Sequence, residues 1–251
     1  MEDFPVKAVL LKKMEFGDFD YILTYFTYEY GNISLIAKNA KKSKKRFSGK
    51  IELFTASEIM FSTPKRGGIP VLTEVSLNEP FENIRSSIIK LCYAGYWSEL
   101  ITYCVPAYKP QEEIYHLLIF LLDMLNKEEV FPEASNLYFQ VHFLKLTGFD
   151  PMLSHCASCG AAFDEFLKSF RFRYDKGGIL CSRCSQFYNG TLSAANVKQI
   201  TWIRKNGFET ASKLKFSKKN INDCTDFLSG FLSYNSGKEF NSQRVIKAFE
   251  L

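Results

Sequence analysis

The stretch DYILTYFTYEYGNISLIA, residues 20–37, decides the fold of the N-terminal part of this 251-residue chain. Two runs rich in β-branched and aromatic residues flank Gly31-Asn32, a pattern typical of a hairpin. Three further runs of similar composition lie at residues 6–16, 52–62 and 69–77. Five short strands in about eighty residues predict a small closed barrel, with the OB-fold as the first expectation and an SH3-like barrel as the alternative.

Beyond residue 78 the apolar residues recur every three or four positions, which predicts helices. The fold class is therefore α+β, a five-stranded barrel followed by helices. The helices are expected at 84–103, 111–125, 134–148, 193–206, 221–234 and 242–249. The composition divides the chain into an OB-fold domain at 1–80, the first part of a helical domain at 81–150, a cysteine module at 151–190, and the C-terminal part of the helical domain at 191–251.

The net charge of +5 is unevenly distributed. It is +2 over residues 1–80, −4 over 81–150 and +7 over 151–251. One run between the third and fourth expected strands holds seven basic residues and no acidic one: Lys38, Lys41, Lys42, Lys44, Lys45, Arg46 and Lys50. Such a run suits nucleic-acid phosphates, an acidic membrane surface or an acidic protein, and we expect flexible lysines there to contact phosphates.

Two CxxC pairs give the sharpest chemical signal. The pairs are Cys156-Ala157-Ser158-Cys159, followed by Gly160, and Cys181-Ser182-Arg183-Cys184, and 21 residues lie between Cys159 and Cys181. Two such pairs complete a tetrahedral four-thiolate shell, so we expect one Zn²⁺ held by Cys156, Cys159, Cys181 and Cys184. A full shell leaves no open coordination position, which makes the zinc structural. The alternative is two unrelated CxxC pairs, one of them redox-active.

Basic residues also surround the cysteines, and Arg171 and Arg173 are expected to contact DNA. Together with the basic run at 38–50, these arginines favour binding of an anion along an extended positively charged surface over binding at a single point. The aromatic residues Tyr21, Tyr25 and Phe26 offer stacking platforms for bases, although in a small barrel each one is more often core. The remaining cysteines, Cys92, Cys104 and Cys224, lie on apolar helix faces and are expected to be core residues.

Catalytic motifs are missing from the sequence. It contains three histidines and no GxSxG, HExxH, GxxxxGK[ST] or GxGxxG, so we expect a protein that is not an enzyme. A zinc nuclease is disfavoured because a Cys₄ shell has no vacancy. No signal-peptide core and no apolar run of membrane-spanning length occur, which predicts a cytosolic chain with reduced cysteines and no membrane partner.

In combination, these features resemble the RecO family of bacterial recombinational repair mediators. The resemblance is carried by Gly17-Asp18 through Gly31, by NISLIAKNAKK, by the run LTGFDP at 146–151, and by GGIL directly before Cys181. The sequence departs from the family pattern at Asp18, where Glu is usual, and at Asn39-Ala40, where the basic loop commonly begins with Gly. Neither departure touches an expected metal ligand.

The resemblance implies an N-terminal OB-fold, a helical domain and a four-cysteine zinc module. It further implies a cytoplasmic, nucleoid-associated protein that binds single- and double-stranded DNA and anneals complementary strands. With RecR it would load RecA onto DNA coated by the single-stranded DNA-binding protein (SSB), whose acidic C-terminal tail it would engage. A competing hypothesis is a zinc-stabilised protein-interaction adaptor whose nucleic-acid binding is incidental.

Overall fold

A computed structural model describes residues 4–43, 45–65, 67–127, 131–163, 167–207 and 216–249. Lys44, one of the expected DNA-binding residues, lies outside them. Contacts divide the chain into two compact units, one formed by residues 1–129 and 240–251 and the other by residues 130–239. Unit 1 is thus built from two separate pieces of sequence, and its boundaries do not coincide with the composition-based ranges 81–150 and 191–251.

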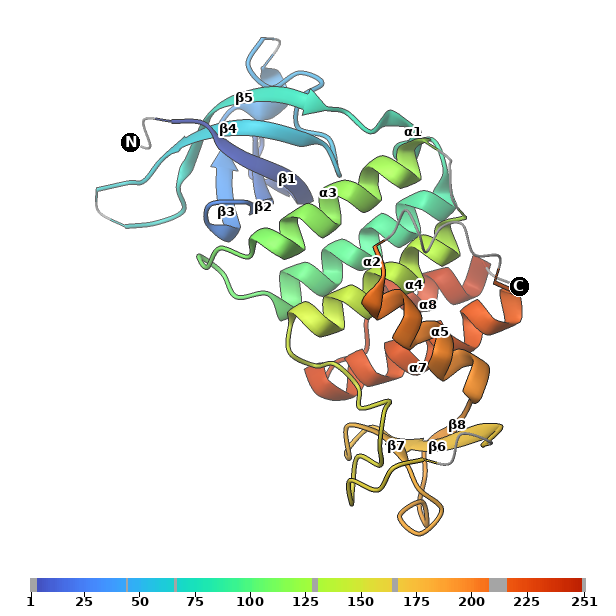
Figure 1. The fold of residues 1–251 in the computed structure, drawn as a ribbon. Helices are drawn as coiled ribbons and strands as arrows, with labels where there is room; N and C mark the ends of the chain where they lie inside the picture. Colours follow the sequence, from blue (N-terminus) through green and yellow to red (C-terminus); the bar gives the residue numbers. More distant parts are fainter. Residues whose placement is uncertain are drawn as a thin grey trace. The chain divides into compact units, whose positions relative to one another are not determined.

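Unit 1 begins with a closed five-stranded barrel in the order β1-β2-β3-β5-β4 (Figure 1). All neighbouring strands are antiparallel except β3 and β5, which meet in parallel at Ile36 and Val71. This confirms the expected OB-fold. The strands are β1 (Val6–Phe16), β2 (Asp20–Thr27), β3 (Gly31–Ala37), β4 (Ala56–Ser62) and β5 (Val71–Glu79). β4 starts four residues later than the sequence suggests because Leu53 and Phe54 lie in a turn, where Phe54 has φ +67°.

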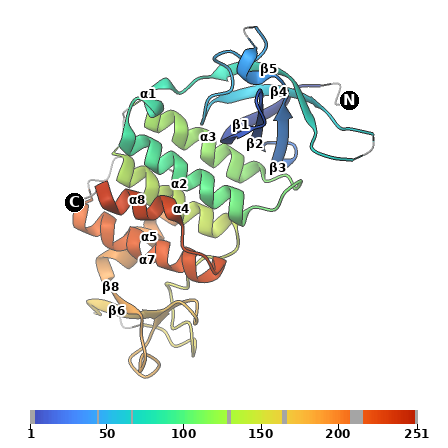
Figure 2. The same cartoon turned by 180° about the vertical axis from the view of Figure 1, so that it is seen from behind.

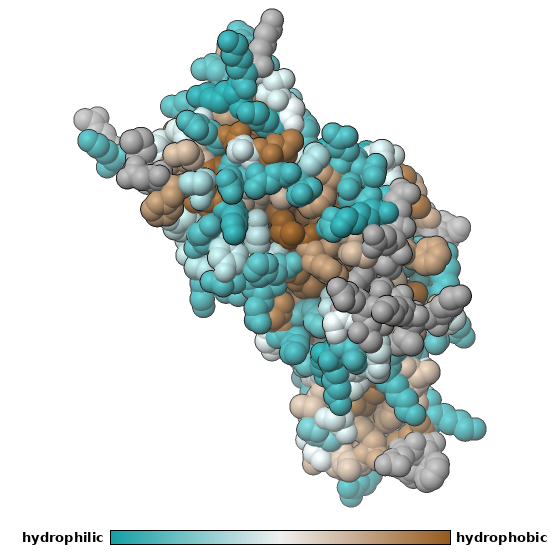
Figure 3. Space-filling model, turned by 45° about the horizontal axis from the view of Figure 1, so that its top comes forward, coloured by the Kyte–Doolittle hydropathy of each residue, from teal (hydrophilic) through white to brown (hydrophobic). Residues whose placement is uncertain are grey.

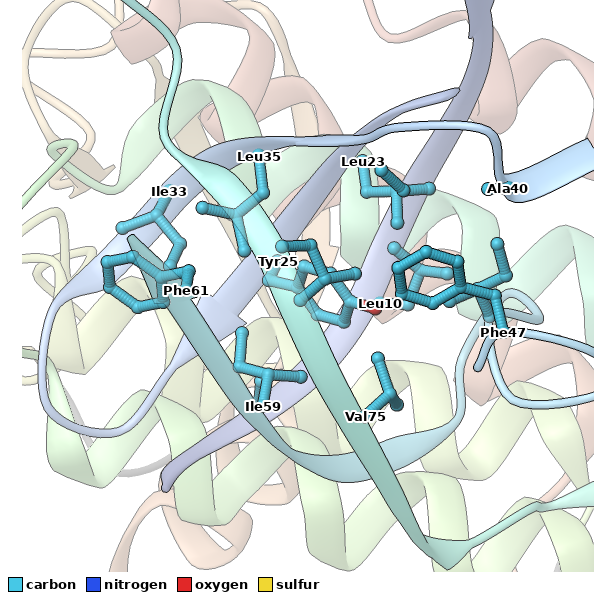
Figure 4. Packing of buried hydrophobic residues seen from close by; sticks show 14 of the residues in the cluster. Leu10, Leu23, Tyr25, Ile33, Leu35, Ala40, Phe47, Ile59, Phe61 and Val75 are labelled. Atoms are coloured by element: carbon cyan, nitrogen blue, oxygen red, sulfur yellow. The ribbon is translucent and has the colours of Figure 1, made fainter. Parts of the chain in front are cut away.

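Apolar side chains from all five strands fill the barrel (Figure 4). The segment between β3 and β4 adds Ala40, Phe47 and Ile51 to this cluster. Phe47 is almost completely buried although basic residues surround it in the sequence. The segment that carries the basic run is therefore packed onto the barrel core through these three side chains. Hydrophilic residues cover most of the barrel surface on the face drawn in Figure 3.

Three helices follow the barrel in unit 1, and the last helix of the chain packs beside α2 (Figure 2). The expected helix start at Ile84 is too early, because a short helix ends at Arg85 and the long one begins only after Ser86 and Ser87. The N-terminal part of α3 meets β2 and the turn after it, where Tyr115 packs against Phe26 and Tyr28. The helices are α1 (Glu82–Arg85), α2 (Ile88–Cys104), α3 (Glu112–Lys127) and α8 (Asn241–Phe249).

Gly31 and Asn32 join the barrel to the end of α2. Gly31 has φ +65°, and a Cβ atom there would collide with the carbonyl oxygen of Lys109. The Asn32 side chain donates hydrogen bonds of 3.0 Å to the carbonyl oxygens of Ile101 and Val105. The Ile101 oxygen also accepts from the Val105 N–H at 3.0 Å, so the Asn32 side chain adds to the hydrogen bonds at the C-terminal end of α2. The Gly31-Asn32 pair that predicted the hairpin therefore also forms a contact between the barrel and α2.

In its described residues, unit 2 combines three helices with a small sheet of order β7-β6-β8 that the sequence patterns did not predict. The strands β6 and β7 are only five and three residues long, too short for a clear alternation of polar and apolar residues. The serines Ser193 and Ser217 cap α5 and α7 by accepting from backbone N–H groups. The elements are α4 (Pro132–Leu146), β6 (Ser169–Arg173), β7 (Gly178–Leu180), β8 (Gly190–Ser193), α5 (Ala194–Lys205) and α7 (Lys218–Ser236).

Of the three cysteines expected in the core, Cys224 is buried between α5 and α7 beside Asn196. Cys92 and Cys104 are only half-buried, so these two do not match the expectation. Within the described ranges, no helix combines the length and the apolar character that crossing a membrane requires.

Candidate metal centre and nucleic-acid interface

The four cysteines of the two CxxC pairs come together in unit 2. The sulfur atoms of Cys156, Cys159, Cys181 and Cys184 all lie within 4.8 Å of one another. The Sγ atoms of Cys159 and Cys181 are 3.7 Å apart. In a tetrahedral site with Zn–S distances of about 2.3 Å, the sulfur atoms are about 3.8 Å apart. The cluster therefore has the size of a four-thiolate metal site.

Tight turns hold each pair in place. Gly160 has φ +72° and donates its N–H to the carbonyl oxygen of Cys156 at 2.9 Å, while Cys184 N–H donates to the carbonyl oxygen of Cys181 at 3.1 Å. The first pair is tied to β7 because Ala157 N–H donates to the carbonyl oxygen of Ile179 at 2.9 Å. The sheet that the sequence patterns did not reveal thus positions the ligands, and Cys181 directly follows β7.

The electrostatic surroundings of the four cysteine thiols favour a bound cation. Burial raises the pKa of Cys156, but backbone N–H groups of Cys181, Cys159 and Ser158 outweigh it and lower that pKa to about 6. The Cys184 thiol has the opposite shift, to a pKa of about 12, because the neighbouring Cys181 and Cys159 side chains favour its protonated form. Four clustered thiols resist losing all their protons together unless a positive charge compensates them. The donor set and its spacing therefore fit a bound Zn²⁺.

The basic run occupies the segment between β3 and β4, as expected. Its first part is fixed to the hairpin that joins β1 and β2: Asn39 N–H donates to Asp20 Oδ1 at 2.7 Å, and Lys41 N–H donates to the carbonyl oxygen of Phe19 at 3.0 Å. Ser43 Oγ then accepts from the N–H groups of Arg46 and Phe47. These hydrogen bonds fix the described residues on either side of position 44.

The cations of this loop are not equivalent. Lys41 Nζ lies 2.9 Å from Glu15 Oε2 and is partly neutralised. Arg46 donates through Nη2 to the carbonyl oxygen of Lys38 at 2.8 Å. Lys42 and Lys45 are exposed and have no carboxylate partner within the described ranges. Lys38 is exposed as well, and Lys50 is half-buried.

Aromatic rings accompany these cations. Lys42 Nζ lies 3.4 Å from the centroid of the ring of Phe19, a residue that no sequence pattern singled out. Lys41 Nζ lies 5.6 Å from the centroid of the Tyr21 ring, and Lys13 Nζ of β1 lies 4.8 Å from it. Tyr25 and Phe26, the other two aromatic candidates, are buried in the structure and have no surface for a base. Among the three expected platforms only Tyr21 therefore has exposed surface.

The two arginines expected to contact DNA lie on β6 in unit 2 and face different partners. Arg173 forms two hydrogen bonds with Asp175, at 2.9 and 2.6 Å, and this contact lowers the pKa of Asp175. Arg171 is exposed, with its guanidinium 4.8 Å from the Tyr188 ring centroid. Of the two, Arg171 is the better placed to meet an external anion.

Comparisons with known proteins cover almost the whole chain. The family model described as recombination protein O N terminal matches residues 1–81, and the model described as recombination protein O C terminal matches residues 85–244. The chain is 37% identical over 251 residues to DNA repair protein RecO of Desulfatibacillum aliphaticivorans, covering 98% of this chain and 97% of the relative. It is 32% identical over 255 residues to the protein of the same name from Desulfosudis oleivorans, covering 98% of each.

A third relative, DNA repair protein RecO of Syntrophus aciditrophicus, is 29% identical and covers 96% of this chain and 93% of its own length. The two family models join at the end of the barrel, between β5 and α2. On these matches, the chain belongs to the recombination protein O (RecO) family.

Proposed function

We propose that this chain is a DNA-binding recombination mediator of DNA repair that binds single- and double-stranded DNA and anneals complementary strands. With RecR it helps to load RecA onto single-stranded DNA coated by SSB, and it engages the acidic C-terminal tail of SSB. The observation that carries the proposal is a basic loop packed through Ala40, Phe47 and Ile51 onto an OB-fold barrel in a chain that belongs to the RecO family.

The annealing step needs no bond chemistry. Phosphates of two strands repel each other, and cations on one surface reduce that repulsion while they hold both strands nearby. Lys42 and Lys45 supply exposed charges for this role, and Arg46 adds a guanidinium fixed through Lys38. Neither the barrel nor the helices need a catalytic group for it, and we propose a non-enzymatic mediator.

The four cysteines hold a structural Zn²⁺ in this proposal. When bound, the ion crosslinks the turn before β6 to the turn after β7 and stabilises the small sheet. Arg171, close to the cysteine cluster, then provides a DNA contact in unit 2. A cytoplasmic location at the nucleoid follows from the same role.

Annealing of complementary oligonucleotides, with and without SSB, tests the proposal. We expect the chain to accelerate annealing of naked strands and to anneal SSB-coated strands as well. RecR and RecA are then added to ask whether RecA replaces SSB faster. A protein that binds neither single nor double strands at low salt contradicts the proposal and favours the interaction adaptor.

A further inference from the structure

The loop between the second CxxC pair and β8 carries two adjacent aromatic residues at its surface. Phe187 is 75% exposed and Tyr188 is 50% exposed. Large aromatic side chains are normally buried because they hold much apolar area, so two such neighbours on one short loop mark a place of contact.

The loop is held firmly on both sides of this aromatic pair. Ser185, which precedes it, is 1% exposed, and its hydroxyl donates to the carbonyl oxygen of Ser182 at 3.1 Å. Asn189, which follows it, donates its N–H to the carbonyl oxygen of Phe172 and accepts from Tyr174 N–H, both at close to 2.9 Å. The rings are therefore exposed on a fixed backbone, which lowers the entropy cost of binding a ligand.

The surroundings of the pair are basic. The Arg171 guanidinium lies over the Tyr188 ring, and it also donates to Ser185 Oγ at 3.4 Å. Asp175 is the only carboxylate among the described residues of 151–190, and Arg173 neutralises it. Three exposed cations on the same module form no ion pair within 4 Å among the described residues: Lys168, Arg171 and Arg183.

We propose that Phe187 and Tyr188 form a stacking site for unpaired bases of single-stranded nucleic acid, with Arg171 beside them to meet the phosphate backbone. An anionic chain with flat apolar rings complements both the charge and the aromatic surface. An acidic peptide satisfies the cations but offers no succession of flat rings. Duplex DNA keeps its bases stacked within the helix, so the site selects single strands. This inference rests on the proposed DNA-binding function and extends it to the metal-bearing unit.

The test compares binding of a fluorescein-labelled oligothymidylate to the zinc-loaded full chain and its variants. The double variant F187A/Y188A should bind roughly tenfold or more weakly, because each stacked base contributes substantially to affinity. The slope of affinity against salt should stay close to that of the unchanged protein, since no cation is removed. F187W/Y188W should restore binding and F187L/Y188L should not, because leucine supplies apolar area without a π face.

A matched control removes an exposed aromatic residue elsewhere in unit 2. Phe131 is 79% exposed, directly before α4 and two residues before Glu133, so F131A should bind like the unchanged protein. Photocrosslinking with 5-iododeoxyuridine should place adducts on residues 187 or 188. Zinc content and thermal unfolding of each variant show whether the module is intact.

The outcomes separate this inference from the proposed function. If the unchanged protein binds the oligonucleotide and F187A/Y188A binds it equally well, with crosslinks mapped elsewhere, the stacking site is refuted while the proposed function stands. If the unchanged protein binds no DNA at all, both are refuted. Equal loss of duplex and single-strand binding in F187A/Y188A also overturns the stacking site.

Discussion

The Lys41 ammonium group lies 2.9 Å from the Glu15 carboxylate, so one cation of the basic loop is paired with the first strand of the same barrel. The pair is at the surface, where such contacts contribute little to stability. In the proposed DNA-binding role we expect a larger effect, because a phosphate must compete with Glu15 for Lys41. Lys42 and Lys45 face no such competition among the residues that the structure describes.

The lysines should therefore differ in their contribution to DNA binding. K42A/K45A should weaken binding of all sequences and reduce the slope of log affinity against log salt by about 0.7 per contact on single strands. K41A should have a smaller effect on both. Fluorescence anisotropy titrations over a range of salt concentrations measure the two quantities.

The carboxylate supplies the reciprocal experiment. E15Q removes the competitor and should tighten binding by a fewfold at low salt, an advantage that high salt removes. If K41A costs as much affinity as K42A/K45A, or if E15Q leaves binding unchanged, the ion pair does not control access to Lys41.

Removal of the metal should unfold part of unit 2. C181S/C184S should retain no stoichiometric zinc and lose the sheet β6–β8, because structural zinc contributes on the order of 10 kcal/mol to small modules. Trp202 on α5 reports on this unit by its fluorescence. The half-buried Cys92, outside the cluster, provides the matched control, and C92S should keep one zinc per chain. Zinc retained by C181S/C184S contradicts the four-cysteine site.

Gly31 should tolerate no side chain. In G31A the left-handed backbone and the collision with the Lys109 carbonyl together should cost about 3 to 4 kcal/mol of unfolding free energy. Gly49 has a similar φ of +69°, but a methyl group there would meet no atom within 4 Å, so G49A should cost only about 1 to 2 kcal/mol. Urea unfolding followed by Trp97 fluorescence in a W202F background measures both, and equal costs count against the collision.

His142 should make stability fall in mild acid. Burial, with the nearby charges of Lys145 and Arg204, lowers its pKa below the ordinary 6.5 despite a hydrogen bond to the Ile203 backbone. The unfolded chain therefore takes up the proton first. This contribution to stability is complete above about pH 6.5 and is lost as the pH falls from there through the lower folded-state value.

The variant H142F keeps a ring against Tyr138, which lies 4.2 Å away between centroids, and removes the titration. Unfolding free energies between about pH 7 and 5 should then depend less on pH than those of the unchanged protein. An identical pH dependence in H142F shows that another group is responsible.

Local patterns in the sequence predicted the strands and helices well, since each depends on a short run of residues. β1 has the expected bounds, and α8 begins within one residue of its expected start. The two CxxC pairs correctly predicted a cysteine cluster, because spacing alone limits where the four thiols can lie.

Pairings between distant residues were not predictable in this way. The sequence of the basic run does not show that Glu15 forms an ion pair with Lys41. The sequence around β6 likewise does not show that Asp175 pairs with Arg173. Both contacts depend on the three-dimensional fold. The sheet β6–β8 was missed for the same reason. Its short strands are held together by long-range hydrogen bonds, and their sequences give a weak local signal.

The discontinuous composition of unit 1 has a consequence for how the protein is made. Residues 241–249 form α8 and complete a unit whose first strand begins at Val6. During synthesis, the surface of α2 that contacts α8 stays uncovered until every residue of unit 2 has been translated. The barrel-bearing unit, first to leave the ribosome, is thus the last to be finished.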